Sequence, residues 1–316
     1  MSPNSWICLH PSNATQTTVS LDNRGLAYGD GFFTTMGVID GQILWLDYHQ
    51  QRLVSHAVAL QLQLDSFSLL TALKTHAKQL QQGMLKLIIT RAEQEVRGYG
   101  YTPNTGGGSA CEIWLKSSPM AITTARSLPL ADGQFIPLQP TASAICLSSQ
   151  IACLPPTLAG LKSLNRLDNV LASGELQAIK AKTLADTIKP SIAEGLLRDI
   201  SGHWVEGTMS NVFYQLVEAP VAKSSNRPHS QNNSSNYLTQ GQWYTPSMAQ
   251  SGVAGVMRQV IIDTLSTSNN PVIIRSLQDE DLPHLSQLFF CNALRGIMPM
   301  SSLRLLSGEV VSFEAI

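Results

Sequence analysis

Lys162 lies in a mostly apolar stretch, Leu158–Leu167, which follows two consecutive prolines and precedes an expected helix. An ammonium group in apolar surroundings loses hydration. This favours the neutral amine, which can act as a nucleophile or a base. The alternative is a lysine whose aliphatic stem packs while its amine reaches water. Taken alone, the stretch favours this second interpretation.

A carboxylate and two hydroxyl side chains lie close together in Glu206–Asn211, which reads EGTMSN. A buried carboxylate can hold the proton on a heterocyclic nitrogen, and the hydroxyls of Thr208 and Ser210 can donate hydrogen bonds to an anion. An ordinary Glu-Gly turn between two strands explains the same pattern. On this motif alone, the turn is favoured.

Small residues, Ser251–Gly255, open an expected helix that continues past Arg258. The first N–H groups of a helix have no partner within it, so this start is a candidate anion site. Arg52 is a candidate for a second contact with a phosphate. There is no GxGxxG motif and no Walker lysine, so the sequence indicates neither a Rossmann nor a P-loop site.

Helices and strands that would position these residues follow from hydrophobic periodicity and turn signals. We expect helices over 47–61, 66–80, 165–182 and 253–265, the first of them capped by Asp47. Asp40-Gly41 predicts a hairpin between two strands within 36–46. Further strands are expected at 85–90, 113–115, 144–147, 193–200, 211–217, 272–274 and 288–291.

The predicted architecture is a mixed α/β fold of two domains, with the site in the cleft between them. We place an N-terminal α/β domain at 1–118, a linker at 119–133 and a C-terminal α/β domain at 134–316. Residues 222–241 are polar and low in complexity. We expect them to form a flexible surface insertion between two strands.

Composition narrows the class of protein. With 43% apolar residues in 316, the chain has enough to bury a sizeable core, and a net charge of −1 leaves no basic surplus for nucleic acid. No apolar run is long enough to span a bilayer, and the first residues do not read as a secretory leader. Five cysteines without a CxxC pair predict reduced thiols in the cytoplasm, and seven histidines without HExxH predict no metal site.

The order of several motifs is more specific than any one of them. In sequence these are Asn23–Thr35, His49–Leu53, Lys162 with Asn165, Glu206–Asn211, and Tyr244–Pro246 followed by Gly252–Arg258. This order resembles the fold-type IV pyridoxal-phosphate enzymes, the family of branched-chain and D-amino-acid aminotransferases, from about Leu21 to Leu303. Within that family the chain is most similar to the aminodeoxychorismate lyases. The features that favour them are Tyr28–Thr35, Arg97–Tyr99, Lys162–Leu167, and Cys291–Leu294 with Met298-Pro299.

The resemblance implies pyridoxal 5′-phosphate as cofactor and Lys162 as the catalytic residue that is linked to it. The implied activity converts 4-amino-4-deoxychorismate to 4-aminobenzoate and pyruvate by elimination, in the synthesis of a folate precursor. The implied cofactor contacts are Arg52, Lys162, Glu206, Ser210, Asn211, Val256, Met257 and Asn292, the last at a position where the family's aminotransferases usually have threonine. The implied substrate contacts are Tyr28, Thr34, Thr35 and Arg97. Thr34 and Thr35 lie in the strand that would face the substrate side, and Arg97 would meet a substrate carboxylate.

Two alternatives stay open at this point. An aminotransferase of the same fold, acting on branched-chain or D-amino acids, needs the same lysine, glutamate and phosphate contacts. A non-catalytic protein that binds the cofactor is the alternative from another class, although intact Lys162, Glu206 and Arg52 argue against it. The resemblance also implies a homodimer, and a small-molecule substrate rather than a nucleic acid or membrane partner.

Overall fold

The computed structural model describes residues 6–10, 18–102, 110–122, 126–130, 135–183, 191–217 and 237–313. The chain packs as two units, one of Met1–Thr123 with Pro155–Leu167 and the other of Thr124–Leu154 with Asp168–Ile316. The segment that carries Lys162 therefore packs with the first unit, although it is flanked in sequence by parts of the second. The predicted insertion at 222–241 lies outside the described residues up to 236.

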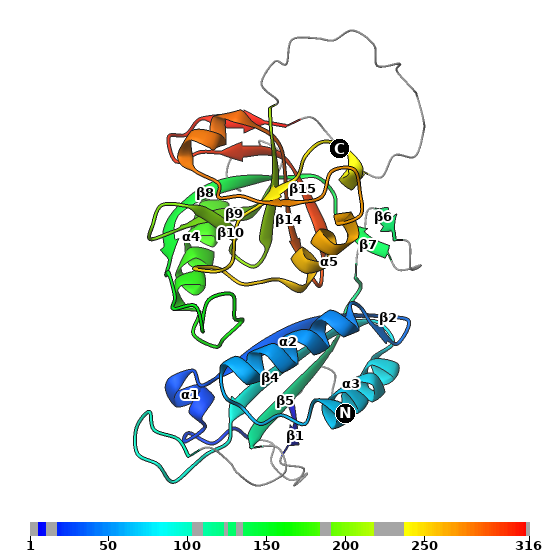
Figure 1. The fold of residues 1–316 in the computed structure, drawn as a ribbon, viewed down its shortest axis with the longest axis vertical. Coiled ribbons are helices and arrows are strands. Elements are labelled where there is room, and N and C mark those ends of the chain that lie inside the picture. Colours follow the sequence, from blue (N-terminus) through cyan, green and yellow to red (C-terminus); the bar gives the residue numbers. More distant parts are fainter. Residues whose placement is uncertain are drawn as a thin grey trace. The chain divides into compact units, whose positions relative to one another are not determined.

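The first unit is built on a five-stranded antiparallel sheet (Figure 1). Its strands, in spatial order, are β1 (Trp6–His10), β5 (Cys111–Pro119), β4 (Gly83–Arg91), β2 (Gly31–Ile39) and β3 (Gln42–Ile43). Strands β2 and β3 form the predicted hairpin, and Asp40 and Gly41 at its tip have φ values of 51° and 71°. These positive values are those of a type I′ turn, for which an Asp-Gly pair is well suited.

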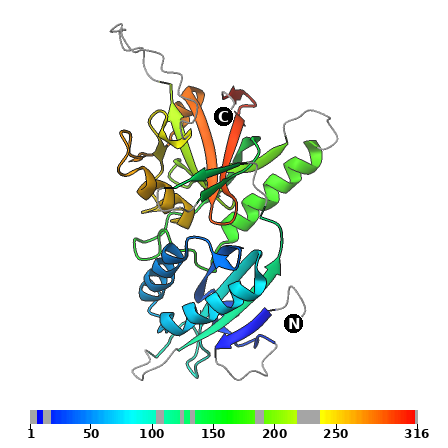
Figure 2. The ribbon, with the colours of Figure 1, turned by 90° about the vertical axis from the view of Figure 1, so that its right-hand side faces the viewer.

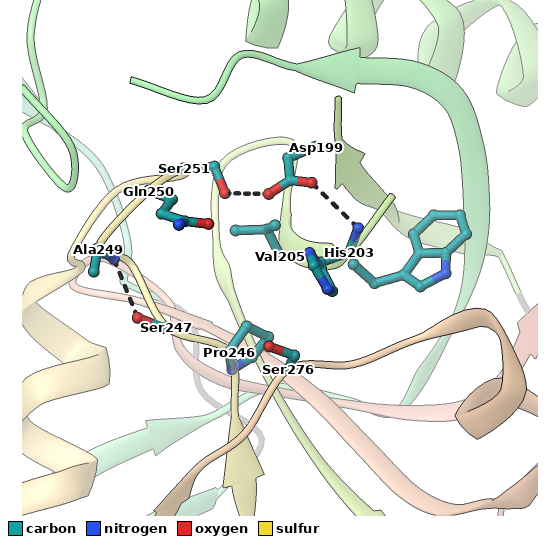
Figure 3. A pocket seen from close by; sticks show the side chains of 10 residues that line it. Asp199, His203, Val205, Pro246, Ser247, Ala249, Gln250, Ser251 and Ser276 are labelled. Carbon is teal, nitrogen blue, oxygen red and sulfur yellow. Dashed lines mark hydrogen bonds between the residues drawn. The ribbon is translucent and has the colours of Figure 1, made fainter. Parts of the chain in front are cut away.

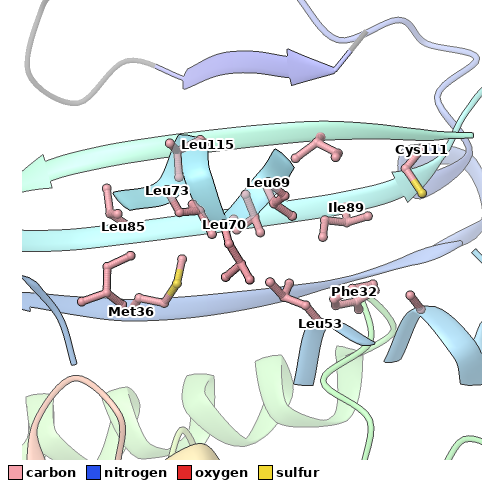
Figure 4. Close-up of a cluster of buried hydrophobic side chains, with 14 of the residues drawn as sticks. Phe32, Met36, Leu53, Leu69, Leu70, Leu73, Leu85, Ile89, Cys111 and Leu115 are labelled. Atoms are coloured by element: carbon pink, nitrogen blue, oxygen red, sulfur yellow. The ribbon is translucent and has the colours of Figure 1, made fainter. Parts of the chain in front are cut away.

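Two helices, α2 (Leu46–Ala59) and α3 (Ser66–Leu80), lie side by side over one face of this sheet (Figures 1 and 2). Their apolar residues join those of β2, β4 and β5 in one buried cluster, drawn in Figure 4. Both helices were predicted, but Asp47 does not cap α2. The N-cap is Trp45, in the left-handed conformation and without a side-chain hydrogen bond, and Asp47 lies in the first turn. The tight turn after β3 starts the helix earlier than the capping preference indicates.

The second unit contains a closed six-stranded barrel. Strands β8 (Ala142–Ile151) and β9 (Ile192–Asp199) pair in parallel, and antiparallel pairs then connect β9, β10 (Trp204–Gly207), β11 (Asn211–Leu216), β14 (Leu285–Asn292) and β15 (Gly296–Arg304). A parallel pair between β15 and β8 closes the ring. One buried cluster draws residues from all six strands, so it fills the barrel interior.

Shorter elements extend the barrel sheet. They are β6 (Arg126–Pro129), β7 (Phe135–Leu138), β12 (Tyr244–Thr245), β13 (Ile273–Ile274) and β16 (Val310–Ser312), with 3-10 turns at Tyr237–Thr239 and Asp279–His284. The end of β5 and the antiparallel pair of β6 and β7 lie within residues 117–142.

Helices α4 (Leu167–Thr183) and α5 (Val256–Leu265) pack on the outside of the barrel, coloured green and orange in Figure 1. Ala172 and Leu176 of α4 lie in a buried cluster with Leu147, Leu197 and Val205 of the barrel strands. The mixed α/β class predicted from the sequence is therefore confirmed. None of the helices within the described ranges is long and apolar enough to cross a membrane.

Candidate functional site

Lys162 is held in the first unit through both polar groups of its backbone. Its N–H donates to Nε2 of His56 at 2.9 Å, and its carbonyl accepts from the N–H of Phe33 on β2 at 3.1 Å. The side chain is half-buried, with Nζ 4.6 Å from the centroid of the Phe33 ring. The amine thus lies over an aromatic face, which provides the apolar surroundings expected from the sequence.

Arg52 belongs to a buried polar stripe on α2, together with His49 and His56. Positions separated by three and four residues share one helix face, and this face packs on the sheet. Only 7% of Arg52 is exposed, and burial lowers its pKa to about 10, so the guanidinium stays protonated at neutral pH. The stripe therefore places a buried positive charge on the helix next to the Lys162 segment.

Glu206, on β10, is buried in the second unit with both carboxylate oxygens engaged. Oε2 accepts from the backbone N–H of Val253 at 2.8 Å, and Oε1 accepts from Nδ2 of Asn169 at 3.3 Å. A carboxylate is a residue type that suits a protonated ring nitrogen as a hydrogen-bond acceptor. Its orientation is fixed by these two bonds.

The loop after Glu206 is organised by Glu194, a buried carboxylate on β9. The hydroxyls of Thr208 and Ser210 both donate to it at 2.6 Å, and the Thr208 N–H donates at 3.1 Å. The hydroxyl hydrogens that were expected to face an anion are therefore directed to Glu194. Ser210 remains able to contact a ligand only as an acceptor or through its backbone.

Asn211 and the start of α5 form one structural unit. Nδ2 of Asn211 donates to the Val253 carbonyl at 2.8 Å, and Oδ1 of Asn211 lies 2.0 Å from the place a Cβ on Gly255 would take. Gly255 is the N-cap of α5 and supplies no side-chain cap. Val256 and Met257 are the first residues of the helix, so their N–H groups have no partner within it.

Asn292 is the last residue of β14, and its side chain caps the turn that follows the strand. Its Oδ1 accepts from the backbone N–H groups of Leu294 and Arg295 at 3.1 and 2.8 Å, while Nδ2 lies 3.5 Å from the Met209 carbonyl. Asparagine thus organises this turn with its carbonyl oxygen, and its amide is directed to the loop that follows Glu206.

Tyr28 and the loop that carries Arg97 lie together in the first unit. The rings of Tyr28, at the end of α1 (Arg24–Tyr28), and Tyr99 meet edge to face at 5.4 Å. Arg24 donates to the Tyr99 carbonyl at 3.3 Å and also pairs with Asp30 at 2.9 Å. Arg97 itself is exposed. The guanidinium of Arg97 is therefore carried by a loop that contacts α1 through Tyr99.

Thr34 and Thr35 lie on opposite faces of β2, because successive side chains of a strand alternate. Thr34 is buried and its hydroxyl bonds Nδ1 of His49 at 2.9 Å, on the face that α2 covers. Thr35 is half-buried and shares its face with Phe33 and hence with the Lys162 amine. The two threonines therefore lie on different faces of β2, and their contacts with a substrate stay predictions.

Three residues of this arrangement were missed from the sequence: His56, Asn169 and Glu194. The spacing of His49, Arg52 and His56 is a helical signal that could have indicated one buried face. No sequence pattern indicates the partners of Glu194 or the contact between His56 and Lys162, which are 106 residues apart.

Within the described residues, no group of three or more His, Cys, Asp or Glu side chains is arranged to hold a metal ion.

A cavity in the second unit is lined by Asp199, Val205 and Ser251 among others (Figure 3). Asp199 accepts from the Ser251 hydroxyl at 2.7 Å, from the Ser201 hydroxyl at 2.7 Å and from the His203 N–H at 3.2 Å. Burial opposes ionisation of Asp199, but these hydrogen bonds hold its pKa below the ordinary value. The carboxylate is therefore structural, joining the loop before α5 to the end of β9.

Each unit offers residue types that suit pyridoxal phosphate. In the first unit, a lysine amine suits an aldehyde and a buried arginine suits a phosphate. In the second unit, a buried carboxylate suits a protonated ring nitrogen and a helix start suits an anion. At the N-cap of α5, Gly255 allows Asn211 to approach closely, since a Cβ there would lie 2.0 Å from Oδ1 of Asn211. These residue types and the mixed α/β fold are those of the fold-type IV pyridoxal-phosphate enzymes.

The chain belongs to the class IV amino-transferase family, whose model matches residues 31–303. It is 24% identical to the aminodeoxychorismate lyase of Vibrio harveyi over 290 residues, which cover 91% of this chain and 88% of that protein. The crystal structure of 4-amino-4-deoxychorismate lyase from Pseudomonas aeruginosa matches with a TM-score of 0.69 and 29% identity, covering 95% of this chain and 92% of that one. The crystal structure of the Escherichia coli branched-chain amino acid aminotransferase matches with a TM-score of 0.64 and 18% identity, covering 95% of this chain and 86% of that one. Enzymes of this family use pyridoxal 5′-phosphate.

Proposed function

We propose that the protein is a 4-amino-4-deoxychorismate lyase, which converts 4-amino-4-deoxychorismate to 4-aminobenzoate and pyruvate. The observation that carries the proposal is the 29% identity to a lyase structure over 95% of the chain. The aminotransferase structure, which shares the fold, is only 18% identical. The loop of Arg97 and Tyr99, anchored beside Tyr28, supports the same conclusion because it offers a cation for a substrate carboxylate.

In this proposal Lys162 holds the cofactor covalently, and Glu206 holds the proton of its ring nitrogen. Arg52 and the N–H groups of Val256 and Met257 bind its phosphate, with Asn211 and Asn292 shaping the surrounding loops. Bound there, pyridoxal phosphate supplies an electron sink for the substrate carbon that bears the amino group. The buried charge of Arg52 suits a dianionic phosphate, since a buried cation is stabilised by a paired anion.

The protein's own part in the reaction is proton transfer and orientation. The amine of Lys162 would act as the general base that removes the proton from the substrate carbon that bears nitrogen. The bond from the neighbouring ring carbon to the enolpyruvyl oxygen then breaks, and the electron pair leaves with that oxygen. Enolpyruvate takes up a proton at its methylene carbon to become pyruvate, and the ring becomes aromatic. Arg97 orients the substrate through a carboxylate.

The test is to incubate the cofactor-bound protein with aminodeoxychorismate and assay 4-aminobenzoate and pyruvate together. We expect both products in equal amounts, and no turnover with Lys162→Ala. A Lys162→Ala variant that retains near wild-type turnover would exclude the assigned role of Lys162. Equal amounts matter because elimination releases one molecule of each product.

A branched-chain or D-amino-acid aminotransferase is the second candidate, favoured by the shared fold with the Escherichia coli enzyme. It requires the same cofactor contacts, so only the substrate separates the two. A visible cofactor band without either lyase product, together with turnover of an amino-acid and keto-acid pair, would favour the aminotransferase over the lyase.

We also infer that the protein is a homodimer in the cytoplasm. Sedimentation velocity would measure its oligomeric state, and cell fractionation would measure its location.

A further inference from the structure

A continuous set of hydrogen bonds connects the backbone of Lys162 to helix α2. The Lys162 N–H donates to Nε2 of His56 at 2.9 Å, and Nδ1 of His56 lies 3.3 Å from the hydroxyl oxygen of Ser55. That hydroxyl lies 3.2 Å from the Arg52 carbonyl and donates to it. The set therefore ends at the residue whose side chain is the proposed phosphate contact.

The direction of these bonds fixes the tautomer of His56. A backbone N–H can only donate, so Nε2 must be the unprotonated nitrogen and Nδ1 carries the proton of the neutral ring. Nδ1 then donates to the Ser55 oxygen, whose own hydrogen goes to the Arg52 carbonyl. All three hydrogen bonds are thus donated in the same direction, from the Lys162 N–H toward the Arg52 carbonyl.

The surroundings of His56 keep the ring neutral and in place. It is buried, and its ring meets that of Phe32 edge to face at 5.3 Å. Burial lowers the pKa of His56 to about 3, and the positive charges of Arg52, Lys162 and Arg166 act in the same direction. A protonated Nε2 would be a donor facing a donor, so only the neutral ring supports this contact.

We infer that His56 is a positioning residue that clamps the Lys162 backbone to α2 and so sets where the Lys162 amine reaches. With its carbonyl bonded to Phe33, Lys162 is held on both sides of its Cα, which leaves only the side-chain torsions to place Nζ. The inference rests on the proposed role of Lys162. A reacting group displaced by about 1 Å can lose about 100-fold in rate, so such a clamp bears directly on catalysis.

Three variants of the full-length protein test the clamp. His56→Phe keeps a ring of similar shape and removes the acceptor, whereas His56→Gln carries an amide oxygen that can take the place of Nε2. His49→Phe is the matched control, because His49 is an equally buried histidine on the same helix that bonds Thr34 rather than the Lys162 segment. Should His56→Phe fail to fold, His56→Asn replaces it, since its shorter amide cannot reach the Lys162 N–H.

The first readout is hydrogen exchange at the Lys162 amide in the cofactor-free protein. The second is the pH midpoint of the visible absorbance of the cofactor-bound protein, without substrate. We expect His56→Phe to speed the exchange about tenfold, the equivalent of one lost hydrogen bond, and to move the absorbance midpoint. With substrate it should lower kcat about 100-fold with little change in KM. His56→Gln should restore all three quantities toward wild type.

Wild-type exchange and absorbance in His56→Phe would overturn the clamp, as would equal changes in His49→Phe. Because neither of these readouts uses a substrate, a failed clamp is distinguishable from absent lyase activity. A protein that shows the clamp in both readouts but forms no 4-aminobenzoate would contradict the lyase assignment alone.

Discussion

At the scale of single residues, the candidate site depends on buried charges whose partners come from distant parts of the chain. Glu206 is 3% exposed and keeps its orientation through Asn169 and the Val253 N–H. A buried carboxylate is stable only when its oxygens are paired, and these two bonds provide that.

Glu206→Gln tests the charge of this side chain while keeping its shape. The amide oxygen can still accept from Val253, so we expect the fold to survive, as judged by circular dichroism. Loss of the negative charge removes the stabilisation of a protonated ring nitrogen, and kcat should fall by about 100-fold. Steady-state kinetics with the purified variant is the measurement, and an unchanged kcat would show that Glu206 is only structural.

His49 makes the stability of the protein depend on pH. Burial, followed by the charge of Arg52, lowers its pKa to about 3. Between about pH 3 and pH 6.5, the ordinary pKa of histidine, His49 binds a proton in the unfolded chain but not in the folded chain. The contribution to stability is therefore fully present above pH 6.5 and is lost as the pH falls toward 3.

The expected slope from this one histidine is about 1.4 kcal/mol of unfolding free energy per pH unit within that range. Thermal unfolding of wild type and His49→Phe from pH 8 to pH 4 measures it. The Tm of wild type should decline more steeply in acid than that of the variant. Parallel curves would mean that His49 titrates normally in the folded protein.

At the scale of elements, the start of α5 is set by contacts outside the helix. Gly255, the N-cap, has no side chain to offer, and Asn211 from β11 occupies the space beside it. Asn211 in turn holds the Val253 carbonyl. The first N–H groups of α5 thus depend on a barrel strand for their position.

Gly255→Ala should weaken binding of the phosphate-bearing cofactor. The added Cβ would lie 2.0 Å from Oδ1 of Asn211, so the loop or the helix start must shift. We expect the Kd for pyridoxal phosphate to rise about tenfold, a loss of about 1.4 kcal/mol, in a fluorescence titration. Gly174→Ala in α4 is the control, because nothing lies within 4 Å of its Cβ. It should leave the Kd unchanged and raise the Tm slightly, since alanine is favoured over glycine within a helix. Equal affinities in both variants would contradict this account of the helix start.

At the scale of the whole molecule, the chain crosses between its two packing units more often than a domain boundary in the sequence indicates. Residues 155–167 pack with the first unit and carry Lys162, while the residues on either side belong to the second. The lysine is therefore anchored on β2 and α2, far from it in sequence. The predicted boundaries at 118, 119–133 and 134 remain predictions.

Removal of residues 222–236 is a prediction at this scale. The polar, low-complexity composition indicates a tolerated insertion, and β11 and β12 on either side of it are paired through Tyr214 and Tyr244. We expect a chain with a short Gly-Ser connection in its place to keep lyase activity within about twofold, because loop length changes stability only slightly. Product assays of the purified variant would decide, and a collapse of activity would assign the segment a role.

The sequence by itself determined the mixed α/β class, the Asp40-Gly41 hairpin, most helices and strands, and the residue types of the candidate site. These follow from local periodicity and from motifs, which need no knowledge of distant contacts. Tertiary structure alone decided that the barrel closes, that Thr34 points away from Phe33, and that Glu194 takes the hydroxyls of Thr208 and Ser210. It also decided that His56 holds Lys162. Each of these depends on which strand pairs with which and on which face is covered, and such long-range pairing leaves no periodic trace along the chain.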